Sequence, residues 1–226
     1  GILGMTMVAS AEPVTNIGIF TDGTPFTNGG FDGYGNAYSY QTLGFSQTLP
    51  WNGVTFDLGS PNQPNVLVAG GQTIPVPQGG FNVLNLAGAA VNGSQQNQQI
   101  RLNFSDGSSV VWTQSFSDWG GPQNYGHESI ISTQSYCDTY SGSTQPFTNH
   151  IYGYSYTIPA GKTLASITLP TNQNVRFLDL QMSFSTPVNL SNSYTSWGIA
   201  NGTKSVNKGE GFDSGGNYYY NGNLQS

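Results

Sequence analysis

The sequence predicts an all-β protein, an antiparallel β-sandwich of jelly-roll-like architecture, and three observations support this prediction. No window of about 11 residues or more places apolar side chains at the 3.6-residue spacing of a helix, and Gly interrupts most windows. Short segments of alternating apolar and polar residues recur along the chain instead. Turns rich in Gly and Pro separate these segments at short, regular intervals, which is typical of antiparallel sandwiches and barrels.

Two hairpins are predicted from their turns. The segment TLPWNGVTFDL, residues 48–58, reads as two strands joined by a type I′ turn at Asn52-Gly53. The segment IRLNFSDGSSVVWTQSF, residues 100–116, reads as a second hairpin that turns at Asp106-Gly107. Leu102 and Phe104 share one face of this second hairpin, and Val110 alternates with its neighbours on the return strand. We therefore expect the nearby Trp112 to lie in the core.

Four further segments complete the series of predicted strands. FNVLNLAGAAV, residues 81–91, sets Phe81 and Val83 against the polar Asn82 and Asn85. HIYGYSYTIPA, residues 150–160, alternates through Ile151. The last two segments are KTLASITLP and VRFLDLQMSF, which end near residue 184.

The chain of 226 residues suits one domain with extensions, and we divide it at two points. Residues 15–185 form the predicted sandwich domain. Residues 186–226 are polar and rich in Gly and Tyr, too poor in aliphatic residues to build a core, and we expect a β extension packed on the sandwich. Within it, Asn201-Gly202 predicts a hairpin turn, and Tyr218 to Tyr220 forms either a last strand or a sticky tail.

Residues 1–14, GILGMTMVASAEPV, form an apolar N-terminal arm with two interpretations. Ala9-Ser10-Ala11 fits a signal-peptide cleavage pattern, with the mature chain starting at Glu12. Alternatively, the arm is retained as a strand that ends before Pro13, and this is the reading we expect. Such a strand needs partners for its backbone and its apolar face, either in its own sheet or in a groove of a neighbouring subunit. The residues of this candidate donor strand are Ile2, Leu3, Met5, Met7, Val8 and Ala9.

Composition narrows the compartment and the partners. Only 7% of residues are charged and the net charge is −6, without a cluster of Lys or Arg, which argues against nucleic acid and anionic membrane surfaces as partners. No apolar run reaches the ~18 residues of a transmembrane segment. Solubility based on amides and hydroxyls fits a secreted or cell-surface protein, including one exposed to acid. We expect the single Cys137 to be buried, and four sequons mark candidate glycosylation sites at Asn92, Asn103, Asn189 and Asn201.

Several motifs together resemble a known module. They include NIGIFTDGTPFTNGGFDGYGNAYSYQTLG, WNGVTFDLG, GQTIPVPQG, VNGSQQNQQ, DGSSVVWTQSFSDW and PQNYGHES. In this order, over about residues 15–185, they resemble a β-sandwich module of secreted microbial proteins that is often appended to glycoside hydrolases and other extracellular enzymes. The resemblance implies a non-catalytic, jelly-roll-like accessory domain for which carbohydrate binding is expected.

The search for catalytic and metal-binding residues gives few candidates. Asp118 and Glu128 are the most suggestive carboxylate pair for a hydrolase, but we expect Asp118 to cap a turn and Glu128 to pair with backbone or with His127. His127 and His150 are expected to be structural or surface residues, since no nucleophile, zinc or phosphate-loop motif accompanies them. We therefore predict no catalytic residues, no enzyme activity and no required cofactor.

Calcium is a minor candidate, because Asp22 and Asp32 lie next to Gly-rich loops that can supply oxygen ligands. The same Asp-Gly pairs also mark ordinary tight turns. For carbohydrate binding, the candidates are Trp119, Asp118, Tyr125 and Trp51, of which Trp119 is the best platform because it lies among Gly and Pro. The alternative is that all the tryptophans fill the core.

Two functions follow from these observations. The first is a structural subunit of an extracellular filament, a homopolymer built by inserting the N-terminal arm into the next subunit. The second is a carbohydrate-binding accessory module of a secreted hydrolase system, with glycans as partners.

Overall fold

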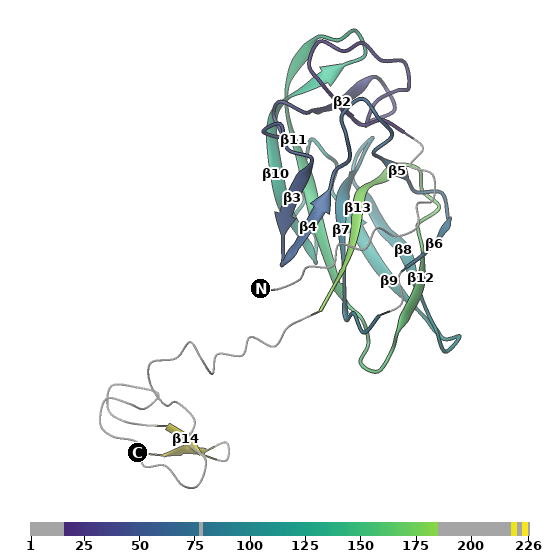
Figure 1. Ribbon diagram of the computed structural model, residues 1–226, viewed down its shortest axis with the longest axis vertical. Helices are drawn as coiled ribbons and strands as arrows, with labels where there is room; N and C mark the ends of the chain where they lie inside the picture. The colour runs from purple at the N-terminus through teal and green to yellow at the C-terminus, as the bar shows by residue number, and fades with distance from the viewer. Residues whose placement is uncertain (1–15, 77–78, 185–217, 221–222, 226) are drawn as a thin grey trace. The chain divides into compact units, whose positions relative to one another are not determined.

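The computed structural model describes residues 16–76, 79–184, 218–220 and 223–225 (Figure 1). The regular structure of these residues is β-strand throughout, and the all-β prediction is confirmed. In these ranges there is no helix long and apolar enough to cross a membrane. The N-terminal arm with its candidate donor strand, the predicted turn at Asn201-Gly202, and the sequons at Asn189 and Asn201 lie outside the described residues.

The chain divides into two compact units, Gly1–Ser185 and Thr186–Ser226. In the second unit, β14 (Tyr218–Tyr220) pairs antiparallel with β15 (Asn223–Gln225). The tyrosine run is therefore a strand, which was one of its two predicted interpretations. Packing of this extension on the sandwich stays a prediction.

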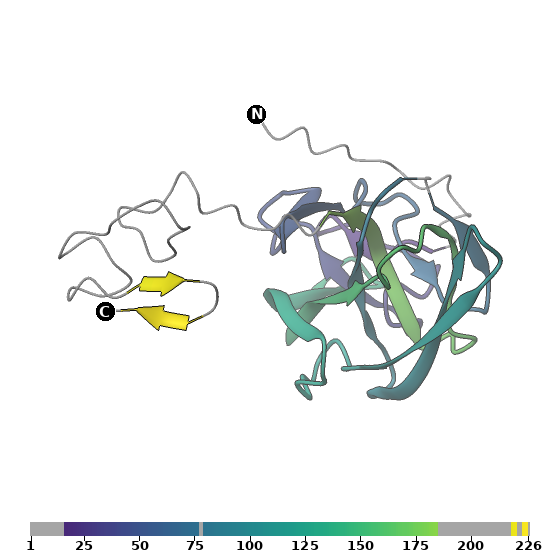
Figure 2. The same cartoon turned by 90° about the horizontal axis from the view of Figure 1, so that it is seen from below.

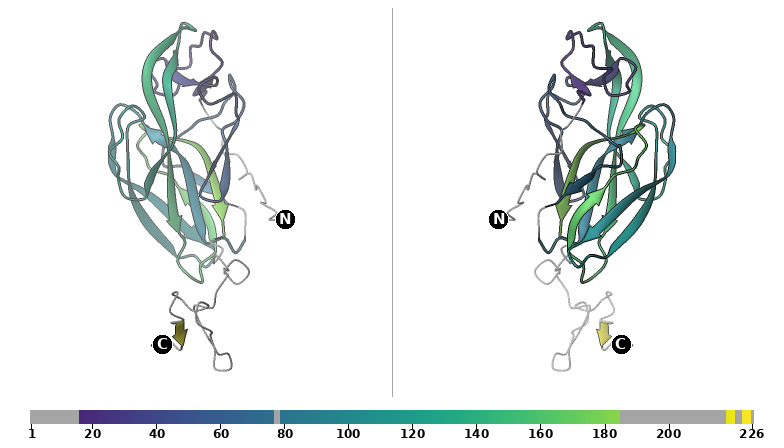
Figure 3. Two further views of the ribbon diagram at one scale, coloured as in Figure 1. Left: turned by 90° about the vertical axis from the view of Figure 1, so that its left-hand side faces the viewer. Right: turned by 90° about the vertical axis from the view of Figure 1, so that its right-hand side faces the viewer.

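The first unit is a sandwich of two sheets that face each other, as Figures 2 and 3 show from two directions. The larger sheet has the strand order β1-β2-β10-β11-β7-β13-β5 and the smaller one β6-β12-β8-β9. Pairing is antiparallel except between β1 and β2. The predicted antiparallel sandwich is therefore confirmed.

The strands of the larger sheet are β1 (Ile19–Phe20), β2 (Asn36–Ser39), β10 (Glu128–Thr139), β11 (Thr144–Thr157), β7 (Val83–Ala90), β13 (Val175–Ser183) and β5 (Leu67–Val68). Those of the smaller sheet are β6 (Thr73–Pro75), β12 (Leu164–Thr168), β8 (Gln95–Phe104) and β9 (Ser109–Phe116). A separate hairpin joins β3 (Thr48–Trp51) to β4 (Val54–Asp57).

Both predicted hairpins are present with the expected turns. Asn52 and Gly53 have φ angles of 49° and 76°, the two positive values that a type I′ turn requires. In the β8–β9 hairpin, the Gly107 N–H donates to the Phe104 carbonyl, and Gly107 has a φ of 83°. A glycine adopts this left-handed conformation without the steric cost that a side chain would bring. As predicted, Trp112 is buried in the core.

The strand predicted within residues 81–91 is present as β7, but its alternation of apolar and polar residues does not correspond to one buried and one exposed face. Every residue of β7 is buried, including Asn85. The reason is that the β3–β4 hairpin covers the sheet on the side away from the smaller sheet. The Asn52 side chain donates to Asn85 Oδ1 at 3.0 Å, and the ring of Trp51 lies so close to Gly153 of β11 that an added Cβ would be 2.8 Å from it. The larger sheet is thus covered on both faces at its centre.

Candidate functional site

The tryptophan predicted as a sugar platform is buried. Trp119 is only 4% exposed, and its ring packs against Phe31, Tyr38 and Phe147 at centroid distances of 5.1–5.3 Å. Its backbone N–H donates to the Ala90 carbonyl, which fixes the residue beside β7. The interpretation of Trp119 as an exposed platform is therefore wrong, because no face of the ring is open to a ligand.

The other carbohydrate-binding candidates do not gather around one surface. Trp51 is half-buried and stacks on Phe56 in the β3–β4 hairpin, with ring centroids 6.1 Å apart. Tyr125 is half-buried in the loop before β10. Within the described ranges, no ring contact or hydrogen bond joins Trp51, Trp119 and Tyr125. Sequence proximity to Gly and Pro therefore did not indicate exposure in this fold.

The carboxylates of Asp118 and Glu128 have structural partners. Asp118 accepts hydrogen bonds from the backbone N–H groups of Gly120 and Gly93 at 2.8 and 2.7 Å, so it caps a turn as expected. Glu128 accepts from the Ser117 N–H, the Ser117 hydroxyl and the Tyr154 hydroxyl at 2.6–2.9 Å. The expectation that Glu128 pairs with backbone is confirmed. Together these bonds tie the loop after β9 to the two sheets.

The two calcium candidates have separate partners. Asp32 accepts hydrogen bonds from the N–H groups of Tyr34 and Asn36, which closes the Gly-rich loop before β2. Asp22 accepts from the hydroxyls of Ser39 and Tyr136 at 2.5 and 2.8 Å. Among the described residues, no group of three or more His, Cys, Asp or Glu side chains is placed to hold a metal ion. Calcium binding by Asp22 and Asp32 stays a prediction.

Asp138 is a buried carboxyl group that sequence reasoning missed. It is 1% exposed, and neither of its oxygens has a hydrogen-bond partner other than the carboxyl group of Asp22. Burial, followed by the nearby Asp22, raises the pKa of Asp138 to about 8. The group is therefore a neutral acid at neutral pH, and it can donate a hydrogen bond to Asp22. The adjacent Cys137 is buried as expected, and burial raises its pKa to about 11.

The two described sequons differ in their surroundings. Asn92 is exposed in a turn with a φ of 59°, and its side chain donates to Asn174 Oδ1 at 3.0 Å. Asn103 is half-buried on β8, and its amide donates to the hydroxyls of Ser166 and Thr168 on β12. A glycan on Asn103 would replace these cross-strand bonds. Glycosylation at either residue stays a prediction.

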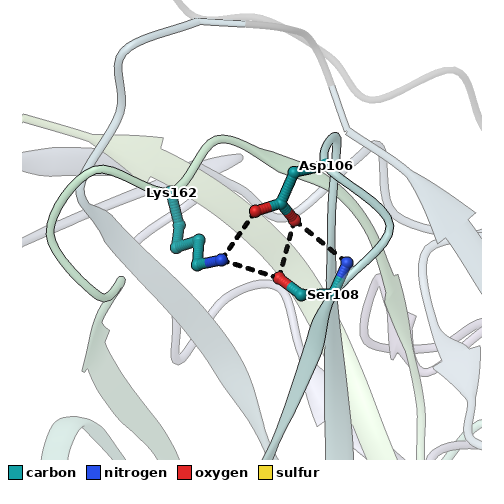
Figure 4. A network of polar contacts seen from close by, with 3 residues as sticks. All are labelled: Asp106, Ser108 and Lys162. Carbon is teal, nitrogen blue, oxygen red and sulfur yellow. Dashed lines mark hydrogen bonds and ion pairs between the residues drawn. The ribbon is translucent and has the colours of Figure 1, made fainter.

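A polar network at the β8–β9 turn is structural in character. The Lys162 ammonium group reaches Asp106 Oδ2 at 2.6 Å and the Ser108 hydroxyl at 2.9 Å (Figure 4). Asp106 also accepts from the Ser108 N–H at 3.0 Å, which closes the turn. All three residues are at the surface, so the network ties two loops together without forming a pocket.

A shallow pocket of about 310 Å³ is the candidate site among the described residues. Its lining side chains all carry hydroxyl or amide groups, and they are Thr42, Thr133, Gln134, Ser135 and Thr148. The first comes from the loop after β2, and the others come from the adjacent strands β10 and β11. The volume lies at the small end of the ~300–1,000 Å³ range of ligand pockets. No charged side chain lines it, so the chemistry of the pocket is that of a neutral hydrogen-bonding site.

An irregularity in the sheet lies beside this pocket. The register between β10 and β11 shifts between Gln134 and Tyr136, because Gln134 pairs with Asn149 whereas Tyr136 pairs with Pro146. The Asn149 side chain donates to the carbonyls of Tyr136 and Phe147, both at 3.0 Å, and so replaces ladder bonds that the bulge removes. Bulges of this kind re-aim side chains and are frequent beside functional sites.

Gln134 is the residue of the pocket with an unmet bonding capacity. It is 1% exposed, its Nε2 donates to the Ser132 hydroxyl at 2.6 Å, and its Oε1 has no hydrogen-bond partner. An unpaired buried acceptor costs roughly 1–3 kcal/mol. Next to it, the Thr133 hydroxyl lies 3.0 Å from Nδ1 of His150, whose pKa is lowered by burial. Burial therefore favours the uncharged form of this imidazole beside the pocket.

Comparisons with known proteins identify the fold family. No curated protein matches the chain. A family model described as the AziU2-like beta-sandwich domain matches residues 15–183. This range covers the two sheets and confirms a β-sandwich module where the sequence predicted one, at about residues 15–185. The chain therefore belongs to the family of AziU2-like β-sandwich domains.

Proposed function

We propose that this chain is a non-catalytic, secreted binding module that takes a neutral, hydroxyl-rich ligand such as a glycan in the pocket at the β10–β11 bulge. The observation that carries the proposal is the pocket lining, in which every side chain carries a hydroxyl or amide group and Thr133, Ser135 and Thr148 are exposed. Hydroxyl groups of a ligand can exchange hydrogen bonds with these side chains. A site built in this way discriminates strongly against analogues that lack the hydroxyl.

The surroundings of the pocket fit the same ligand class. The loop that supplies Thr42 also carries Phe45, which is 65% exposed and meets the ring of Tyr40 edge-on at 5.8 Å. An exposed aromatic ring beside hydroxyl and amide groups is a surface on which the apolar face of a sugar can pack. The absence of charged lining residues favours neutral sugars over uronic acids or phosphates.

The test is binding to a panel of neutral and acidic polysaccharides by affinity electrophoresis, followed by calorimetry with an oligosaccharide of the retained polymer. Thr148→Val keeps the volume and removes a lining hydroxyl, and we expect it to weaken binding at least tenfold. Thr55→Val, on an exposed position of β4, is the matched control and should bind as the wild type does. Retention of no neutral polymer, or equal binding by Thr148→Val, would contradict the proposal.

A second candidate function is a subunit of an extracellular filament that assembles through its N-terminal arm. The observation that favours it is β9, an eight-residue strand at the edge of the smaller sheet that, among the described residues, pairs on one side only. Open edges of this kind accept an added strand from another chain. Deletion of residues 1–11 should convert particles seen by electron microscopy into monomers. Unchanged particles after the deletion would exclude this function.

A further inference from the structure

We propose that the free edge of β9 is the acceptor for residues 1–11 of a second copy of this chain, which add to the smaller sheet as a fifth strand. This inference rests on the filament function proposed above and is independent of the pocket.

β9 differs from the other sheet edges of the described residues. The sandwich has four edge strands, of which β1 and β5 are two residues long and β6 is three residues long with Pro75 at its end. Short strands and proline are common means of blocking unwanted strand pairing. β9 has eight residues, no proline and no charged side chain. It is therefore the edge among these four that offers a full ladder.

The register of the β8–β9 hairpin shows which backbone groups of β9 face outward. The Phe104 N–H donates to the Ser108 carbonyl at 2.9 Å, so these two residues form a hydrogen-bonded pair. In an antiparallel ladder, hydrogen-bonded pairs alternate with non-bonded pairs. Leu102 with Val110 is then the next bonded pair, because β8 and β9 stay in register from there. The backbone groups of Ser109, Val111 and Thr113 consequently point away from β8.

These outward groups are accessible as far as the described residues show. Ser109, Val111 and Thr113 are exposed residues, and Val111 is 38% exposed. The loop before β10 does approach β9, but through a side chain that points between the sheets, since Gln114 Nε2 donates to the Gly126 carbonyl at 2.9 Å. Among the described residues, no backbone hydrogen bond from outside the β8–β9 hairpin reaches Ser109, Val111 or Thr113.

The N-terminal arm is chemically matched to this edge. From Ile2 to Ala9 it has eight residues, the length of β9, with neither charge nor proline. Its alternating faces allow one row of side chains to lie on the sheet and the other to face solvent. Glu12 and Pro13 end the matching stretch, because proline lacks the N–H that a ladder needs.

Chain geometry favours a second copy over the same chain. The Asn16 N–H donates to the Val66 carbonyl, next to β5, and β6 follows β5 after a short loop. β9 is at the opposite edge of the smaller sheet from β6, three strand spacings or roughly 14 Å away. The smaller sheet itself lies about 10 Å from the larger sheet, to which β5 belongs. Residues 12–15 span at most about 14 Å when extended. They are too short to lay the arm along β9 of their own chain, so the contact runs head to tail and need not close.

The experiment uses the full chain with one new cysteine per molecule, since the native Cys137 is buried. Tagged Met5→Cys protein is mixed with differently tagged Thr113→Cys protein and oxidised gently, and Val111→Cys is run in parallel to cover a shift in register. We expect a disulfide between the two tags, identified by peptide mass spectrometry. Gln99→Cys is the matched control, because Gln99 pairs with Thr113 but lies one strand inside the edge. Cross-linking to neither edge cysteine, or equal cross-linking to Gln99→Cys, would overturn the proposal.

A proline variant separates this inference from the broader filament function. Thr113→Pro removes an outward N–H and leaves the β8 ladder intact, so it should be folded by circular dichroism yet monomeric by sedimentation velocity. If Thr113→Pro assembles normally and deletion of residues 1–11 does not, the filament function stands and the β9 acceptor is wrong. If the wild type is monomeric at every concentration, or if the secreted protein begins at Glu12, both are wrong.

Discussion

The carboxyl group of Asp138 lies against the carboxylate of Asp22, and each opposes a negative charge on the other. Two hydroxyl groups, from Ser39 and Tyr136, donate to Asp22. Asp138 has no such donors and is buried, and this burial, followed by the nearby Asp22, raises its pKa to about 8. The Asp138 carboxyl group therefore keeps its proton at neutral pH.

Stability should therefore fall as the pH rises through the neutral range. The pKa of Asp138 is about 8 in the folded protein and close to 3.8 in the unfolded chain, so between these values the folded state holds a proton that the unfolded state has released. The free energy of unfolding then decreases with pH, by at most about 1.4 kcal/mol per pH unit from this group. Urea titrations between pH 4 and pH 9 measure the slope.

Asp138→Asn is the variant that checks the assignment, because it keeps the shape and cannot ionise. It should flatten the decline in stability between pH 4 and pH 8, while the half-buried Asp179, whose pKa is raised to about 6, retains a smaller contribution of the same sign. Gln96→Leu, at an exposed position of β8, serves as a control and should keep the wild-type slope. A wild-type slope in Asp138→Asn would show that another group is responsible.

Trp119→Ala should act on stability. The ring is in contact with three aromatic side chains, and its removal leaves a cavity in the core. Truncation of a buried Trp typically costs about 3–5 kcal/mol. Thermal unfolding should show a large drop in Tm, whereas Thr148→Ala at an exposed position should leave the Tm nearly unchanged. A small effect for Trp119→Ala would contradict the observed packing.

The ion pair between Lys162 and Asp106 should matter less than the turn that Asp106 closes. Both side chains are substantially exposed, so salt screens their attraction. Lys162→Met should lower the Tm slightly, and the difference should disappear at about 1 M NaCl. Asp106→Ala should lower the Tm more, and salt should not remove the whole effect, because the hydrogen bond to the Ser108 N–H is also lost. Equal effects of the two variants would contradict this order.

The thiol of Cys137 should be unreactive in the folded protein. It is 1% exposed, and its pKa is raised to about 11, so little thiolate forms at neutral pH and reagents do not reach it. An aromatic disulfide reagent should label about one thiol per chain in denaturant and far less in native buffer. The labelling rate in native buffer would then report the opening of the fold around β10.

Local turn chemistry made parts of the fold predictable from the sequence. Asn52-Gly53 and Asp106-Gly107 predict their hairpins because these turns require positive φ angles, which Asn and Gly adopt most readily. Trp112 was placed correctly because its strand has one solvent face, and alternation then reports burial.

Where a second layer covers a sheet, the same reasoning fails. The polar side chain of Asn85 is of a type usually found at the surface. Its partner Asn52 comes from a hairpin distant in the sequence, and no local sequence pattern indicates that contact. Trp119 was misplaced because Gly and Pro neighbours suggested an exposed loop, whereas its position depends on Phe31 and Tyr38 from the start of the chain. The pocket was missed because Thr, Ser and Gln are common throughout this sequence, and the bulge at Gln134 that gathers them has no local signature.

Because the β3–β4 hairpin covers the larger sheet, the two sheets should differ in which positions tolerate substitution. In most strands of a sandwich, every second position tolerates many residues, while the alternate positions are restricted by packing in the core. Saturation mutagenesis along β7 should show no such alternation. Asn85 is constrained by its contact with the hairpin as strictly as Leu86 is constrained by packing in the core. Along β9 the alternation should be clear, with Val111 and Thr113 tolerant of substitution and Trp112 intolerant. The comparison would show where this fold has three layers and where it has two.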